Sequence, residues 1–125
     1  MVSVLLVDDS KFSCKRQAEM LREVNPEFEV EMRFLPSEVI TIVNEDDRNF
    51  DLIFLDFNMP EYNGLELAEI LKDKIPYEKM VLITATSAFT TKSKELPEGM
   101  RIIQKPLSIE KLQATLSPIE LKRGA

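Results

Sequence analysis

The sequence contains no histidine and only one cysteine in 125 residues. Without histidine, the chain has no histidine general base, no histidine metal ligand and no phosphohistidine of its own, so a partner must supply any such group. A single cysteine, Cys14, excludes a disulfide within the chain and favours a reducing compartment. Cys14 falls in a predicted helix, where a small core side chain is a better interpretation than a reactive thiol.

Long apolar runs and an excess of basic residues are also missing. No run approaches the roughly 18 residues that span a bilayer, and the N-terminus has the pattern of a strand followed by acids, not of a signal peptide. The net charge of −6 argues against sequence-independent binding to nucleic acid and against anionic membrane surfaces. We therefore expect a cytoplasmic protein with neither nucleic acid nor a membrane as partner.

The length and the apolar pattern indicate one domain over residues 1–125. Strands are predicted at 2–7, 28–34, 51–56, 79–84 and 100–104, and helices at 10–24, from 36, at 63–74, at 86–95 and from 108. Strands that alternate with helices predict a doubly wound α/β fold, with a parallel five-stranded sheet and helices on both faces.

Three expectations concern single helices. Four apolar residues of the helix at 10–24 share the face that should turn to the core: Phe12, Ala18, Leu21 and Val24. The segment 86–95 is rich in threonine and serine and is the weakest predicted helix. Pro118 should fray or kink the end of the last helix.

Acidic and basic side chains follow the most apolar strands. Asp8 and Asp9 end the first strand, and Asp56 ends the central strand. Lys105 follows the fifth strand. Because ligands of open α/β sheets bind at the carboxyl ends of the strands, we expect these four side chains to converge on one edge. Three acids without a counter-charge are costly, and Mg²⁺ prefers carboxylates and water, so the pattern predicts a Mg²⁺ site with a lysine aimed at an anion.

Each of these residues also has a simpler interpretation. Asp8 and Asp9 could cap the following helix, and Asp56 could form an Asx turn. Thr84, which ends the fourth strand, could be an ordinary β-branched strand residue, and Lys105 a surface lysine. In the functional interpretation, a carboxylate such as Asp56 attacks phosphorus to give an acyl phosphate, and Thr84 donates its hydroxyl to a phosphoryl oxygen.

Five segments that contain these residues occur in a fixed order: Leu5–Ser10, Leu55–Pro60, Asn63–Leu67, Ile83–Ala85 and Gln104–Leu107. Together they resemble the receiver domain of bacterial two-component response regulators, over nearly the whole chain. The resemblance implies a flavodoxin-like sheet with strand order 2-1-3-4-5. Since the last predicted helix begins near Ser108 and leaves little sequence for another module, we expect a stand-alone signalling switch with no output domain of its own. The resemblance implies a protein that is not an enzyme beyond self-phosphorylation and autodephosphorylation.

The resemblance implies a role for each site residue. Asp56 would accept a phosphoryl group from a histidine kinase or phosphotransfer protein. Asp9, Asp56 and the backbone carbonyl of Asn58 would bind Mg²⁺ directly, and Asp8 would act mainly through a metal-bound water. Lys105 would pair with the acyl phosphate, or with Asp56 before transfer.

Further residues would serve the phosphorylated state. Thr84 would bond a phosphoryl oxygen, and Ala85 would leave room for the phosphoryl group. Phosphorylation would then alter binding to an unknown downstream protein. Two positions depart from the family pattern, because Ile102 and Leu107 stand where aromatic residues are usual. We therefore expect the segment around Thr90 to change in place of the usual aromatic ring.

Three alternatives stay open at this point. A receiver-like scaffold could bind partners without phosphorylation, although the complete set of acids, threonine and lysine argues against it. A phosphatase of the haloacid dehalogenase type would need a second acid two residues after Asp56, where the chain has Asn58. A flavin-binding domain is disfavoured because the acids after the first strand would repel a phosphate.

Overall fold

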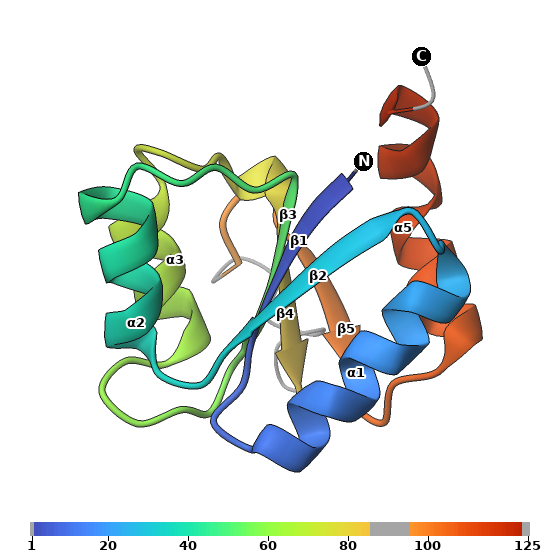
Figure 1. Cartoon of the computed structure of the whole chain (residues 1–125), viewed down its shortest axis with the longest axis horizontal. Helices are drawn as coiled ribbons and strands as arrows, with labels where there is room; N and C mark the ends of the chain where they lie inside the picture. Colours follow the sequence, from blue (N-terminus) through green and yellow to red (C-terminus); the bar gives the residue numbers. More distant parts are fainter. Residues whose placement is uncertain (1, 86–95, 124–125) are drawn as a thin grey trace.

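A parallel sheet forms the centre of the structure, a computed structural model that describes residues 2–85 and 96–123, with side chains described as far as Leu116. Its strands are β1 (Val2–Val7), β2 (Phe28–Arg33), β3 (Leu52–Asp56), β4 (Met80–Thr84) and β5 (Arg101–Gln104). They lie in the order β2-β1-β3-β4-β5, and every neighbouring pair is parallel (Figure 1). The predicted strand order is confirmed.

Helices cover both faces of the sheet, as predicted. α1 (Lys11–Val24) and α5 (Ile109–Arg123) lie on one face, and α2 (Pro36–Ile40) and α3 (Gly64–Leu71) lie on the other (Figure 1). A π-helical turn, Thr41–Glu45, continues α2, and a 3₁₀ turn, Tyr77–Lys79, precedes β4. The helix expected at 86–95 lies outside the described residues. Within the described part of the chain, no helix has the length and apolarity to span a membrane.

The apolar core has two layers, one on each side of the sheet. Alternate side chains of the central strands supply both: Leu6 and Phe54 pack beneath α1 and α5, whereas Leu5 and Ile53 pack beneath α2 and α3. All five residues of β3 are buried. This double burial explains why the central strands are continuous apolar runs, whereas β2, at the edge, alternates between apolar and charged residues.

α1 corrects one prediction, because Phe12 does not face the core. Its side chain is 74% exposed, and the buried face of α1 consists of Cys14, Gln17, Ala18 and Leu21. Two residues at about 100° each place Phe12 almost opposite Cys14 around the helix. The prediction is therefore right for Ala18, Leu21 and the partly buried Val24, wrong for Phe12, and it left Cys14 and Gln17 out of the buried face.

α5 corrects a second prediction. Ser108 accepts a hydrogen bond from the backbone N–H of Lys111 at 3.1 Å, as expected of a helix cap, but the helix continues beyond Pro118 to Arg123. A proline removes one helical hydrogen bond and crowds the carbonyl four residues earlier, but here the residues that follow it extend the helix. The fraying expected at Pro118 is therefore not observed, whereas a kink there stays a prediction.

The strand register brings the carboxyl ends of four strands to one edge. Val7 of β1 pairs with Leu55 of β3, and Asp56 then pairs with Ile83 of β4. At the end of β4, Thr84 pairs with Gln104 of β5. Asp8 comes directly after β1 and Lys105 directly after β5, so residues from distant parts of the chain meet at this edge.

Candidate functional site

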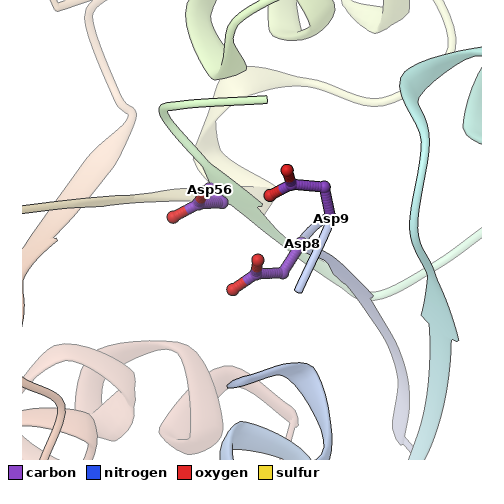
Figure 2. Close-up of side chains that lie close together, drawn as sticks. All are labelled: Asp8, Asp9 and Asp56. Carbon is purple, nitrogen blue, oxygen red and sulfur yellow. The ribbon is translucent and has the colours of Figure 1, made fainter. Parts of the chain in front are cut away.

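Three carboxylates gather at the carboxyl edge of the sheet. Ligand oxygens of Asp8, Asp9 and Asp56 all lie within 4.8 Å of one another. Figure 2 shows the three side chains projecting toward the same region from the ends of β1 and β3. Asp8 and Asp56 are 2% and 5% exposed, whereas Asp9 is exposed. Oxygen donors in such a group suit Mg²⁺, which prefers one or two carboxylates plus water, so the residues present fit this ion.

Lys105 supplies the positive charge of the site. Its Nζ lies 2.9 Å from Asp56 Oδ1, and its side chain is 33% exposed. The backbone N–H of Lys105 donates to the carbonyl of Thr84 at 2.8 Å, which ties the residue to the end of β4. The Lys105–Pro106 peptide bond is cis. The predicted convergence of the lysine with the acids is therefore observed.

Burial and charge shift the pKa values of this pair. Burial raises the pKa of Asp56, and the charges of Asp8 and Asp9 raise it further, so that the pKa stays above its ordinary value despite the hydrogen bond from Lys105. Burial alone would lower the pKa of Lys105, but the hydrogen bond to Asp56 and the negative charges of the acids outweigh it and raise the pKa. The ionised form of Asp56 is thus destabilised by burial and by the neighbouring acids, and Lys105 stays protonated beside it.

The other predicted site residues lie at or just after the carboxyl ends of β3 and β4. Thr84 is 1% exposed at the end of β4, the strand between those of Asp56 and Lys105. Ala85, directly after it, is exposed. Asn58 is also exposed, two residues after Asp56 in the loop that leads to α3. Each lies at the expected edge of the sheet.

α1 and its N-cap residue hold Asp8 in place. Asp8 Oδ1 accepts a hydrogen bond from the N–H of Ser10 at 2.9 Å, and Ser10 itself caps α1 by accepting from the N–H of Ser13. Capping of α1 is therefore the role of Ser10. Asp8 Oδ2 accepts a second bond, at 2.9 Å, from Nε2 of the buried Gln17. Sequence reasoning missed Gln17, although a polar residue within the apolar stripe of a helix was a usable signal.

α3 approaches β3 closely because it begins at a glycine. A Cβ on Gly64 would lie 2.8 Å from the carbonyl oxygen of Asp56 and 2.6 Å from Leu82 Cδ1. The side chains of Asn63 and Glu66 form a capping box, each accepting from the other's backbone N–H at 2.8 Å. The chain that follows Asp56 is thereby fixed at both ends of its loop.

A groove adjoins the site between α1 and the segment after β5. It has a volume of about 410 Å³, and its lining includes Phe12, Met20, Lys105, Pro106 and Leu107. Since Lys105 also bonds Asp56, the groove reaches the edge of the acid cluster. An apolar rim beside buried charges is typical of a surface that a partner covers.

A comparison with protein families identifies the family of this chain. A family model described as the response regulator receiver domain matches residues 4–117. The chain belongs to the response regulator receiver family. Membership sets aside the phosphatase and flavin-binding alternatives, and it makes this chain a receiver domain of two-component signalling.

Curated relatives place the receiver domain within longer regulators. The chain is 30% identical over 117 residues to the sensory transduction protein LytT of Bacillus subtilis, which covers 93% of this chain and 47% of that protein. It is 31% identical to the transcriptional regulatory protein ZraR of Klebsiella oxytoca, with 93% and 26% covered. The chain thus spans about half the length, or less, of these relatives.

Solved structures share the fold of this receiver domain. A response regulator receiver domain protein from Clostridium thermocellum superposes with a TM-score of 0.82 at 19% identity, with 98% of each chain covered. The Vibrio cholerae chemotaxis protein CheY4 gives a TM-score of 0.78 at 24% identity, covering 95% of this chain and 98% of that one. The flavodoxin-like fold predicted from the sequence is confirmed.

Three residues singled out in the sequence lie near the receiver site without joining it. Ile102 is partly buried against the apolar layer beneath α2 and α3, and Leu107 packs against the layer beneath α1 and α5. Cys14 is fully buried, and burial, with the charges of Asp8 and Asp56, raises the pKa of its thiol to about 12. The core interpretation of Cys14 is confirmed, because a buried thiol with this pKa stays protonated at neutral pH.

Proposed function

We propose that this receiver domain is a phosphoacceptor switch, in which Asp56 takes a phosphoryl group from a histidine kinase or phosphotransfer protein with Mg²⁺ bound. One observation carries the proposal: a buried Asp56 lies among two further acids and is hydrogen bonded to Lys105 at 2.9 Å. A nucleophilic carboxylate needs a cation to offset its charge and that of the phosphoryl group, and this edge of the sheet offers both a cation-binding cluster and a lysine.

The transfer step follows from the chemistry of these groups. A carboxylate oxygen of Asp56 attacks the phosphorus of a phosphohistidine, and an oxygen–phosphorus bond forms while the nitrogen–phosphorus bond breaks. The bonding electron pair stays on the imidazole nitrogen of the donor. No proton leaves Asp56, because its carboxylate attacks in the ionised form. Catalysis is then mainly a matter of position and charge neutralisation.

The acid cluster would hold the metal ion. Asp9, Asp56 and the backbone carbonyl of Asn58 would be direct ligands, and Asp8 would act mainly through a bound water. When bound, Mg²⁺ would neutralise the acids and the phosphoryl oxygens. The exposure of Asp9 and Asn58 supports this assignment, because a metal that carries waters and a phosphoryl group needs an open side.

The remaining site residues would respond to the new anion. Lys105 would turn from the Asp56 carboxylate to the acyl phosphate, and the Thr84 hydroxyl would bond a phosphoryl oxygen. Ala85, with its small side chain, would leave room for the phosphoryl group. A phosphoryl group shifts the protein between two states only as far as it binds one state better, and the altered face would then bind a downstream protein.

We assign donor docking to the groove between α1 and the segment after β5. A donor protein must bring its phosphorylated nitrogen to Asp56 and must therefore cover the rim of the site. That rim is apolar, with Phe12 74% exposed and Pro106 and Leu107 beside it. Aromatic residues on such surfaces contribute strongly to protein association.

The test is the intact mass of the protein after incubation with acetyl phosphate and Mg²⁺. The wild type should gain one phosphoryl group, and Asp56→Asn should gain none. Asp51→Asn is the matched control, since Asp51 is a carboxylate at the opposite end of β3 that bonds the Ser3 N–H. It should be labelled like the wild type.

Two results would decide against the proposal. A wild type that gains no mass, and whose stability does not respond to Mg²⁺, would favour the scaffold that binds partners without phosphorylation. Labelling that persists in Asp56→Asn would place the acceptor elsewhere.

A further inference from the structure

The buried stripe of α1 contains one polar side chain. Cys14, Ala18 and Leu21 are apolar and at most 1% exposed, and Gln17 lies among them with 6% of its surface exposed. An amide buried without a hydrogen bond costs about 1–3 kcal/mol in proteins. A glutamine at this position is therefore tolerable only where specific partners satisfy its amide.

Its partner is an acid of the metal cluster. Gln17 Nε2 donates to Asp8 Oδ2 at 2.9 Å and to Ser13 Oγ at 3.1 Å. The other oxygen of Asp8, Oδ1, accepts from the N–H of Ser10 at 2.9 Å. Each oxygen of the carboxylate is thus held by one donor, the N-cap residue Ser10 or Gln17 in the second turn of α1, so the carboxylate cannot rotate without breaking a bond.

We propose that Gln17 is a positioning residue for the metal site, which fixes the carboxylate of Asp8 toward the space shared with Asp9 and Asp56. A carboxylate offers about four lone-pair positions, so the two internal bonds leave acceptor capacity for a metal-bound water. The amide carries no charge, and it orients Asp8 without neutralising the cluster. This inference rests on the Mg²⁺ site of the proposed function and adds a residue on which that site depends.

The test compares Mg²⁺ binding by the wild type and Gln17→Met. Methionine matches glutamine in length and suits a buried helix position, but it cannot donate a hydrogen bond. The Mg²⁺ dissociation constant, measured by calorimetry or amide shifts, should rise by about tenfold or more in the variant, as for other residues that orient metal ligands. Cys14→Ala, a change on the same stripe, should reduce stability and leave the dissociation constant within about twofold of the wild-type value.

The outcomes separate the inference from the function on which it rests. A wild type that binds Mg²⁺ together with a Gln17→Met protein of equal affinity overturns the role of Gln17 alone. A wild type that binds no Mg²⁺ overturns the metal site and, with it, this inference. If Gln17→Met does not fold, the side-chain amide resonances of Gln17 in the wild type give the answer. They should shift during a Mg²⁺ titration, and resonances that stay fixed at saturation overturn the proposal.

Discussion

Replacing Asp56 by asparagine should stabilise the fold when no divalent cation is present. The acids of the cluster have oxygens within 4.8 Å of each other, and Lys105 Nζ lies 2.9 Å from Asp56. At an effective dielectric constant of about 20, each acid at the 4.8 Å limit costs about 3.5 kcal/mol, and the lysine contributes about 6 kcal/mol. The two repulsions together slightly exceed the attraction, and burial adds a desolvation cost. An amide of the same shape avoids the net repulsion and the desolvation cost of a buried charge. The free energy of unfolding of Asp56→Asn should therefore exceed that of the wild type by about 1–2 kcal/mol in EDTA at pH 7.

The stability gained in Asp56→Asn should decrease as the pH falls. Because the pKa of Asp56 is raised in the folded state, the folded protein binds its proton more tightly than the unfolded chain does. The contribution of Asp56 to stability is therefore most favourable below the ordinary pKa of 3.8 and is lost as the pH rises through the folded-state pKa. The difference between variant and wild type should be full at pH 7 and should shrink as the pH falls toward 4.

Urea unfolding followed by circular dichroism measures the effect, and a gain of 1 kcal/mol corresponds to a rise of about 4 °C in Tm for a chain of this size. Glu31→Gln is the matched control. Although burial opposes the shift, hydrogen bonds and charges from Arg48 and Arg33 lower the pKa of Glu31, so this variant should lose stability at pH 7. Saturating Mg²⁺ should stabilise the wild type more than Asp56→Asn. An Asp56→Asn protein less stable than the wild type in EDTA would refute the reasoning.

Three further changes test the site and its surroundings. Lys105→Met should lower the free energy of unfolding in EDTA by about 1–2 kcal/mol, because the attraction of about 6 kcal/mol between the two charges is largely offset by solvent screening of the 33%-exposed lysine and by the cost of burying it; an unchanged urea midpoint would contradict this. Gly64→Ala should cost about 1–3 kcal/mol in urea unfolding, since its Cβ would meet Leu82 and the Asp56 carbonyl, and a neutral result would show that α3 shifts freely. Phe12→Ala should slow phosphoryl transfer from a cognate kinase by about tenfold and leave labelling by acetyl phosphate unchanged in rate; equal slowing with both donors would speak against docking at this groove.

Much of the fold could be predicted because its signals are local. Apolar runs such as Leu52–Leu55 mark strands buried on both faces, and Asn63 with Glu66 marks a helix start. The order of these elements then limits the sheet to few topologies. Pro118 shows where local rules fail, since a proline weakens a helix without fixing its end. The strand order 2-1-3-4-5 came from the family resemblance, because periodicity alone does not say which strands are neighbours.

The convergence of Asp8, Asp56 and Lys105 could also be predicted, because each residue marks the end of a parallel strand. The hydrogen bonds within the site could not. The bond from Lys105 to Asp56 depends on the path of a long side chain, and the closeness of α3 depends on contacts between Gly64 and Leu82. Such contacts follow from three-dimensional packing, and the sequence contains only weak signals of them, such as a glycine directly after a helix cap.

Phe12 and Gln17 break the amphipathic pattern of α1 in opposite directions, and both lie beside the acid site. An exposed aromatic ring and a buried amide each cost free energy in an ordinary helix. The amide of Gln17 is compensated within the chain by Asp8, whereas we propose that the ring of Phe12 is covered by a phosphodonor. The residues of α1 that violate the helical pattern are therefore better guides to this site than those that obey it, since local departures from folding rules concentrate where function requires them.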